Sequence, residues 1–285
     1  MLDVRVQASG PEHPETMTIR GDLAYETSLA GDAAGARDLY AALLPVAEYT
    51  LGPEHPDTLT ARSNLAYYTG EAGDVVGARD QYAALLPVRE RVSGPEHPET
   101  LAARSHLAHY TGEAGDVAGA RDQYAALLPV AQRTLGPEHP ETLTARGNIA
   151  CGTGLAGDAV GARDQYAALL PVRERVSGPE HPDTLSDRGS LAHYTGEAGD
   201  VAGARDQYAA LLPVTEDTLG PEHPDTLTAR SNLAYYTGEA GDVAGARDQY
   251  AALLPVRERV SGPEHPDTLS DRGSLAYWTL EADHS

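Results

Sequence analysis

A single segment, GPEHPDTLTARSNLAYYTGEAGD in its second copy, recurs along the chain at a fixed interval of 42 residues. Six full copies occupy residues 10–261, and a partial seventh occupies residues 262–285. Residues 1–9 resemble the end of such a copy and are expected to form part of the second helix of a preceding repeat. A strict period of about 20 to 50 residues is typical of stacked arrays, in which each repeat packs on its neighbours. The period therefore predicts an array and not one or two globular domains.

Each copy contains the signals of two helices joined by a tight turn. In the second copy, Pro56 fits the first position of a helix, where its missing N–H costs nothing. Gly73 is a stop signal for this helix, and Asp74 can cap the next one. The second helix is expected to end near Gly94, where glycine and proline stand together. The sequence thus predicts an all-α fold of helix-turn-helix units.

A proline interrupts the pattern of every second helix. It is Pro87 in the second copy, and it recurs as Pro45, Pro129, Pro171, Pro213 and Pro255. Proline inside a helix removes one backbone hydrogen bond and crowds the carbonyl four residues earlier, which typically costs ~3 kcal/mol. We expect a regular kink or an early break at this position, and two shorter helical pieces are the alternative.

Composition limits the classes of partner and of site. The formal net charge of −22 repels phosphate backbones, so nucleic acid is not expected as a partner. The chain has no apolar run of about 18 residues that could span a membrane, and residues 1–9 lack the apolar core of a signal peptide. The single Cys151 cannot form an internal disulfide. We expect a soluble, cytoplasmic protein, and the absence of lysine beside abundant Ala, Gly and Pro suggests a high-GC bacterial genome.

Size and composition also predict that the repeats depend on one another. The chain has no phenylalanine, and its core must be built from Leu, Ala, Val and Tyr. Units of about 40 residues usually need outside help to fold, because they cannot bury enough apolar surface. Stacking provides that help, since each repeat covers the apolar face of the next. We therefore expect an α-solenoid.

The segment NLAYYTGEAGDVAGARDQYAALL of the sixth copy resembles the helix-turn-helix pattern of tetratricopeptide repeats. In the second copy Leu65–Ala66, Gly73–Asp74, Ala78 and Tyr82 match that pattern in order. The period and the linker LGPEHPDTL are similar to the variant found in kinesin light chains and in many actinobacterial proteins. Thr69 departs from it, because an aromatic residue is usual there. The resemblance implies a right-handed α-solenoid that serves as a non-catalytic, protein-binding scaffold, with its first helices lining a concave groove.

One histidine precedes the first helix of every copy, at His13, His55, His97, His139, His181, His223 and His265. In this position a side chain can satisfy the free N–H groups of the helix start. Successive copies in a stack lie ~10 Å or more apart, whereas nitrogen ligands lie about 2 Å from a zinc ion. We interpret these histidines as part of the repeat fold, and we expect neither a metal nor a cofactor.

Other apparent motifs give no support for catalysis. His106 and His109 lie three residues apart on a helix, which permits a two-point metal site, but polar groove residues are the preferred interpretation. Cys151 has no neighbouring basic group in sequence that would activate its thiol. The Asp and Glu residues are spread through each repeat as caps and solvated faces. No enzyme activity is expected.

Differences between copies concentrate on one stripe of the first helix. In the second copy this stripe contains Thr60, Ser63, Asn64, Tyr67 and Glu71, which share one helical face. In tetratricopeptide proteins the corresponding stripe contacts the ligand, so we expect it to bind a peptide, and drift after duplication is the alternative. The asparagines would bind backbone amides, the tyrosines would offer flat surfaces, and the glutamates would favour basic side chains. The counterparts are Ser105, His106, His109, Glu113, Asn148, Cys151, Ser190, His193, Glu197, Ser231, Asn232, Tyr235 and Glu239.

Two further features are seen when the copies are compared. Arg62 and its counterparts recur unchanged, and we expect them to form ion pairs between stacked repeats. The ends of the second helices alternate, because RERVS follows three of the prolines, whereas AEYTL, AQRTL and TEDTL follow the other three. This alternation indicates that some copies arose in pairs and gives an uneven charge along the array. It suggests no mechanism.

The last segment, SLAYWTLEADHS, is expected to form a capping helix. It brings two large apolar residues, Trp278 and Leu280, to the end of the array. Exposed end faces of repeat arrays are normally polar, and a head-to-tail contact between such ends propagates. Self-association into a structural rod through Trp278 and Leu280 is therefore the alternative to peptide binding in the groove.

Overall fold

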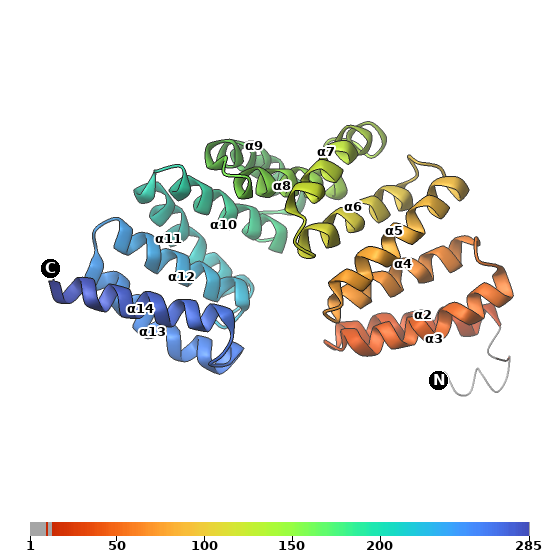
Figure 1. Ribbon diagram of the computed structural model, residues 1–285, viewed down its shortest axis with the longest axis horizontal. Coiled ribbons are helices and arrows are strands. Elements are labelled where there is room, and N and C mark those ends of the chain that lie inside the picture. The colour runs from red at the N-terminus through yellow and green to blue at the C-terminus, as the bar shows by residue number, and fades with distance from the viewer. Residues whose placement is uncertain (1–9, 11–12, 285) are drawn as a thin grey trace. The chain divides into compact units, whose positions relative to one another are not determined.

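The computed structural model describes residue 10 and residues 13–284, and over these residues it contains thirteen α-helices (Figure 1). The first helices of the repeats are α2 (Pro14–Leu29), α4 (Pro56–Glu71), α6 (Pro98–Glu113), α8 (Pro140–Leu155), α10 (Pro182–Glu197), α12 (Pro224–Glu239) and α14 (Pro266–His284). The second helices are α3 (Ala33–Leu51), α5 (Val75–Val92), α7 (Val117–Thr134), α9 (Ala159–Ser177), α11 (Val201–Thr218) and α13 (Val243–Ser261). The predicted stack of helix-turn-helix repeats is confirmed, and the helix predicted for residues 1–9 lies outside the described residues.

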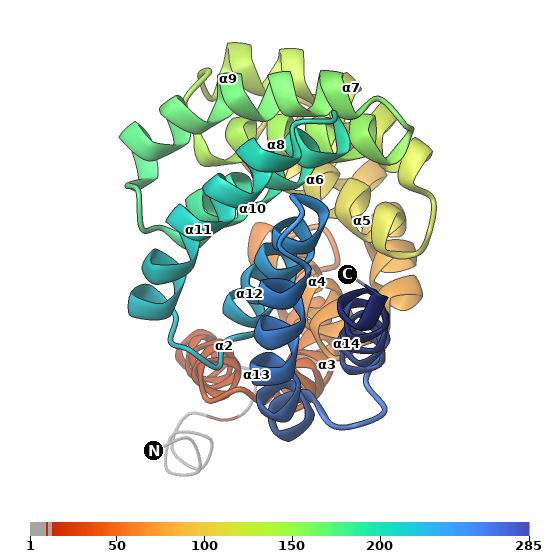
Figure 2. The same ribbon diagram turned by 90° about the vertical axis from the view of Figure 1, so that its left-hand side faces the viewer.

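The chain divides into two compact units, Met1–Ala145 and Arg146–Ser285, which are described separately. Within each unit a helix packs on its neighbours in sequence, and first helices of consecutive repeats also touch. In the second unit, α10 lies beside α12 in this way (Figures 1 and 2). The division falls within α8, in which Gly152 stands where most first helices have a tyrosine.

The histidine before each first helix is its N-cap. The Nδ1 atom of His55 accepts a hydrogen bond from the backbone N–H of Asp57 at 3.2 Å, which satisfies one free donor of the helix start. The same bond recurs at the other histidines, His13, His97, His139, His181, His223 and His265. The interpretation of the histidine row as part of the repeat fold is confirmed.

The turn between the two helices of a repeat has the predicted chemistry. Gly73 follows the first helix with φ 95°, a conformation that side chains other than glycine rarely adopt. Asp74 then caps α5, because its Oδ1 atom accepts a hydrogen bond from the backbone N–H of Gly77 at 2.9 Å. The two residues together reverse the chain and place α5 against α4.

Each second helix runs without a break through its proline. α5 extends from Val75 to Val92 as one helix, with Pro87 on its exposed side. Ala83, whose carbonyl loses its usual partner, is exposed as well. Water can therefore satisfy that carbonyl, which makes the proline tolerable in mid-helix. The predicted early break and the two-piece alternative are wrong.

The apolar core forms between repeats, as the low content of large apolar residues requires. The cluster around α5 combines Leu59, Tyr82 and Leu85 of one repeat with Ala103 and Tyr110 of the next. The cluster around α11 in the second unit is built in the same way. Because both repeats contribute to one core, neither can bury its apolar face alone.

A tyrosine of one repeat lies directly on a glycine of the repeat before it. The ring of Tyr236 packs against α10 at Gly196, where an added Cβ atom would lie 2.2 Å from the ring. Its hydroxyl donates a hydrogen bond to the backbone oxygen of His193 at 3.1 Å. This close approach requires glycine, since any side chain would collide with the ring.

Trp278 occupies the same position at the last junction. Its ring packs on Gly238, and its side chain is only 4% exposed. The prediction that Trp278 presents an apolar surface for self-association is therefore wrong, because the side chain belongs to the core. Leu280 is 60% exposed.

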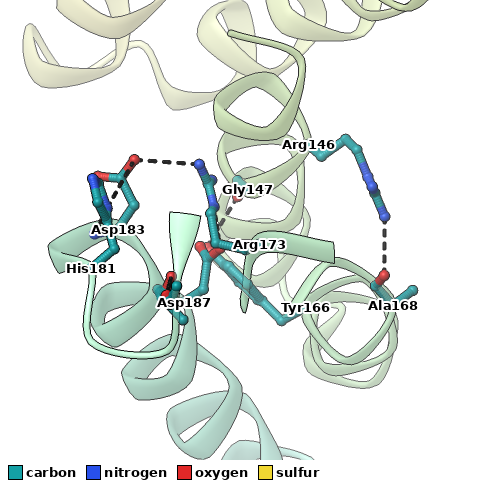
Figure 3. Close-up of polar contacts among 10 residues, drawn as sticks. Arg146, Gly147, Tyr166, Ala168, Arg173, His181, Asp183 and Asp187 are labelled. Atoms are coloured by element: carbon teal, nitrogen blue, oxygen red, sulfur yellow. Dashed lines mark hydrogen bonds and ion pairs between the residues drawn. The ribbon is translucent and has the colours of Figure 1, made fainter. Parts of the chain in front are cut away.

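The predicted ion pairs between repeats are present. Arg62 of α4 pairs with Glu48 of α3, and Arg104–Glu90, Arg188–Glu174, Arg230–Glu216 and Arg272–Glu258 are the corresponding pairs. In the third repeat Gln132 replaces the glutamate, and Arg146 of the fourth repeat donates instead to the backbone oxygen of Ala168 at 3.2 Å (Figure 3). These partly exposed pairs each contribute at most about 1 kcal/mol.

Candidate functional site

The stripe of varying residues lies along the first helices, and its members differ in accessibility. Thr60, Glu71, His109, Glu113, His193, Glu197, Tyr235 and Glu239 are exposed. Ser63, Asn64, Tyr67, His106, Asn148, Cys151, Ser190, Ser231 and Asn232 are half-buried. Ser105 differs from the prediction, because its side chain is 6% exposed and cannot contact a ligand on this face.

Two asparagines of the stripe hold tyrosines of the second helices beneath them. The Nδ2 atom of Asn64 donates to the hydroxyl of Tyr40 at 3.0 Å, and Asn232 makes the same bond to Tyr208 at 3.1 Å. The Tyr208 hydroxyl in turn donates to the backbone oxygen of Gly189 at 2.9 Å. Since the amide nitrogens are used in these bonds, each asparagine offers its amide oxygen as an acceptor.

His106 takes the place of this asparagine in the third repeat. Its ring stacks on Tyr82 with a centroid distance of 5.1 Å and meets the edge of Tyr67 at 5.6 Å. Burial, and secondly the proximity of His109, lower the pKa of His106 to about 4. His106 is thus a neutral aromatic side chain at physiological pH. It stacks on the ring of Tyr82, whereas the asparagines donate hydrogen bonds to tyrosine hydroxyls.

A pocket of about 260 Å³ opens between α10 and α12. Tyr208, Leu211 and Thr215 of α11 form its floor, and Asn232 lies in its α12 wall. Asp225, whose side chain is exposed, lies at the rim. We call this cavity the α10–α12 pocket.

A second pocket, of about 230 Å³, occupies the corresponding place between α2 and α4 in the first unit. Tyr40, Leu43 and Ala47 of α3 contribute to its floor. Asn64 and Asp57 correspond to the asparagine and the aspartate of the first pocket. We call this cavity the α2–α4 pocket.

At alternate junctions between repeats, an arginine of the second helix fills the corresponding space. We call such an arginine a plug and its junction plugged, and we call a junction with a pocket open. Arg173 is 3% exposed and lies between α8 and α10 (Figure 3). Its Nε atom donates to the Oδ2 atom of Asp187 at 2.9 Å, and its Nη1 atom donates to Asp183 at 3.3 Å. Burial raises the pKa of Asp187, and Arg173 counteracts part of this rise.

The corresponding arginine between α12 and α14 has the same two carboxylates. The Nε atom of Arg257 donates to Asp271 at 2.9 Å, and its Nη1 atom lies 3.6 Å from Asp267. Arg257 is 2% exposed and Asp271 is 2% exposed. Both plugged junctions of the second unit therefore contain a buried ion pair that is held by hydrogen bonds.

Arg89, between α4 and α6, is an incomplete version of this plug. Its guanidinium donates to the Oγ atom of Ser63 at 3.1 Å and lies 3.5 Å from Glu99. Ala103 stands where the other plugged junctions have an aspartate, and the buried Nε atom of Arg89 has no hydrogen-bond partner. Burial lowers the pKa of this guanidinium.

One position of the second helix thus separates the three plugged junctions from the two pockets. The plugs carry arginine on the second helix, whereas the two pockets have Ala47 and Thr215 at that position. The facing residue of the next first helix is Ala61 or Ala229 at the pockets. The alternation of RERVS is visible in the sequence, but its link to the facing residue one repeat later was not predicted. The available signal was the aspartate in TLSDRGS, which follows two of the three RERVS segments.

No group of three or more His, Cys, Asp or Glu side chains in the described part of the chain could hold a metal ion. None of the described helices is long and apolar enough to cross a membrane.

The family of the chain follows from six consecutive matches to the pattern described as "Tetratricopeptide repeat". They cover residues 16–57, 58–99, 100–141, 142–183, 184–225 and 226–267. The chain belongs to the tetratricopeptide-repeat family. Members of this family are repeat scaffolds that are generally non-catalytic. No curated protein matches the sequence.

Solved structures share the fold of this tetratricopeptide array. A putative kinesin light chain of Podosopora anserina with nearly identical TPR-like repeats is 22% identical, with a TM-score of 0.60, over 73% of this chain and 98% of that chain. BtubC (BKLC) from P. vanneervenii is 18% identical, with a TM-score of 0.60, over 93% of this chain and 94% of that one. A Rap protein complexed with Competence and Sporulation Factor is 13% identical, with a TM-score of 0.60, over 94% of this chain and 88% of that one.

Proposed function

We propose that this tetratricopeptide array binds an extended segment of a partner protein along the face formed by its first helices. The observation that carries the proposal is the coincidence of sequence variation with cavities. In each unit a pocket is walled by residues of the varying stripe, such as Asn64 and Asn232. The caps, ion pairs and tyrosine–glycine contacts that hold the repeats together recur in most copies. Drift after duplication would not by itself direct the changes to the walls of pockets.

The chemistry of the face favours a basic segment. Glu71 and its counterparts Glu113, Glu197 and Glu239 are exposed at the end of the stripe in four repeats. The net charge of −22 adds a long-range attraction for cationic chains. Tyr235, which is 41% exposed, offers a flat amphipathic surface at low entropic cost. Backbone amides of an extended segment can donate to the amide oxygens of the asparagines.

The fold neighbours support the same class of function. The Rap protein was solved in complex with Competence and Sporulation Factor. These solved structures resemble this chain in fold alone. We therefore infer the partner of this array from its own surface and not from the partners of its neighbours.

Selection of displayed random dodecapeptides against the whole chain tests the proposal. Replacement of Asn148, Asn232 and Tyr235 together with alanine should weaken the selected peptides by at least about tenfold, because it removes two amide acceptors and one aromatic surface. Asp206→Ala, an exposed change on a second helix, is the matched control and should leave binding unchanged. Circular dichroism melts would verify that both variants fold. Equal affinity of the folded triple variant and the wild type would overturn the proposal.

A further inference from the structure

We propose that the α10–α12 pocket and the α2–α4 pocket each bind the guanidinium group of an arginine in the partner segment. This inference rests on the proposed function and names the side chain that the face recognises. The chain itself supplies the main evidence, because its own arginines occupy the equivalent space at the plugged junctions.

The first step of the argument is the equivalence of the spaces. Thr215 and Arg257 hold the same position in consecutive second helices, exactly one repeat apart in sequence. Arg257 extends between α12 and α14 and is 2% exposed, whereas Thr215 is too short to fill the corresponding space between α10 and α12. The pocket is therefore the volume that an arginine side chain occupies elsewhere in the same fold. Its size of about 260 Å³ also lies below the roughly 300 Å³ at which pockets for larger ligands begin.

The second step is the carboxylate that remains at the open junctions. Asp183 and Asp267 lie 3.3 and 3.6 Å from the Nη1 atoms of the two plugging arginines. Asp225 holds the same position at the rim of the α10–α12 pocket, and no arginine of the described residues pairs with it. Its carboxylate lies 3.8 Å from the Nδ1 atom of its own cap, His223. The open junction thus retains one of the two anions that hold the plug.

Asp57 repeats this arrangement in the first unit. It lines the α2–α4 pocket, and its carboxylate lies 3.8 Å from the Nδ1 atom of His55. Among the described residues no arginine pairs with Asp57, whereas Glu99, one repeat later, lies 3.5 Å from Arg89. Both pockets therefore combine an empty arginine-sized space with an available carboxylate.

The third step concerns selectivity for a guanidinium group. The second anion of the plug, such as Asp271, is replaced by Ala229 at the open junction. Asn232 instead offers a neutral amide oxygen in the wall. A planar guanidinium can donate to this oxygen and to the carboxylate at once, which a compact ammonium group does less well. A neutral urea group of the same shape lacks the attraction to Asp225.

Binding is best measured with a defined probe on the isotope-labelled whole chain. The probe is the peptide acetyl-Gly-Arg-Gly-amide, and the matched control is the same peptide with citrulline, which is nearly isosteric and uncharged. We expect the arginine peptide to shift the side-chain amide signals of Asn232 and Asn64 in a saturable manner. The citrulline peptide should bind at least about tenfold more weakly, since it lacks the charge. Equal shifts from both peptides, or none from the arginine peptide, would overturn the inference.

Variants that exchange the junction types provide the decisive control. Thr215→Arg with Ala229→Asp installs the plug of the next junction, and it should abolish the response at Asn232 while leaving that at Asn64. The reverse exchange, Arg257→Thr with Asp271→Ala, should create a third site between α12 and α14. Asp225→Asn should weaken the response at Asn232 by at least about fivefold. An unchanged response at Asn232 in the plugged variant, verified as folded by its spectrum, would refute the pocket assignment.

The two proposals can fail separately. If dodecapeptides bind the wild type and lose affinity in the triple alanine variant, but the plugged variant still binds them fully, only the pocket assignment fails. If no displayed peptide depends on the stripe but the arginine peptide still saturates the pockets, the extended-segment proposal fails and the guanidinium site stands as an isolated site.

Discussion

Acid should destabilise this array through His106, and asparagine in its place should remove that part of the pH dependence. The ring of His106 is stacked on Tyr82 and meets the edge of Tyr67, so a charge there would be poorly solvated. Burial is the main reason that the pKa of His106 falls to about 4 from its ordinary value of 6.5. The unfolded chain takes up this proton as the pH falls through 6.5, whereas the folded chain resists it until about pH 4.

The sign and size of the effect follow from this difference. Because the folded-state pKa of His106 lies below the unfolded value, protonation favours the unfolded chain, and the free energy of unfolding decreases between these two values. Each pKa unit corresponds to about 1.4 kcal/mol, so the full loss is roughly 3 kcal/mol, most of it reached by about pH 4.5. Below pH 4 both states carry the proton, and this contribution stops changing.

Urea unfolding at about pH 7.5 and pH 4.5, followed by circular dichroism, measures the effect. The matched variant is His106→Asn, which installs the residue found at Asn64 and Asn232. All other titrating groups are shared, so the difference between the two proteins isolates His106. The wild type should lose about 2–3 kcal/mol more than the variant on acidification. An equal loss in both proteins would refute the reasoning, as would an assigned His106 ring signal that titrates near pH 6.5 in the folded wild type.

Three further changes test the packing rules of the repeat. Gly196→Ala should lower the free energy of unfolding by about 1–3 kcal/mol or more, because the new methyl group collides with a tyrosine of the next repeat. Gly189→Ala on the same helix has its nearest neighbour at 3.7 Å and should be neutral or stabilising by up to about 1 kcal/mol, so equal thermal melts of the two variants would contradict this account. His181→Ala should cost about 1 kcal/mol and His181→Asn should restore most of it in urea unfolding, since asparagine is also a good N-cap; a loss from both would show that the cap bond is not what stabilises the helix. Ala103→Asp should give the buried Nε atom of Arg89 an acceptor and raise the free energy of unfolding by roughly 1 kcal/mol, and a lower unfolding midpoint would show that desolvation of the new carboxylate dominates.

The helix boundaries were predictable from the sequence because local chemistry determines them. Pro56 begins α4, Gly73 follows its end in a left-handed conformation, and Asp74 caps α5, each for a reason that lies within a few residues. The effect of Pro87 was not predictable from local chemistry alone. Whether the helix breaks there depends on which side faces solvent, and that is decided by packing on the neighbouring helices.

The candidate face was predictable in outline and not in detail. Helical spacing placed Asn64 and Tyr67 on one stripe of the first helix. It could not reveal that Asn64 is bonded to Tyr40, or that Ser105 and Trp278 are buried, because these contacts come from residues one helix or one repeat away. The alternation of the second-helix ends was recognised in the sequence, but its structural role was not. The residue that each end contacts lies on the first helix of the next repeat, which the spacing within one helix does not reveal.

If the pockets bind guanidinium groups as proposed, the alternation of plugs and pockets determines which junctions of the array can bind an arginine of the partner. A junction is held by an aromatic ring that packs on a glycine, as Tyr236 does on Gly196, by its helix cap and by its core. Ala229, which faces the second-helix position, belongs to this core. Exchange of Arg257 and Asp271 for the Thr215 and Ala229 types replaces a buried ion pair by a cavity, and buried pairs often contribute little net stability. Opening a junction would therefore exchange an internal arginine for an external one, at the cost of the cavity that remains until the external arginine binds. In an array built from near-identical copies, two substitutions, one in each of two consecutive copies, would then be enough to add or remove a proposed binding site while the stack stays intact.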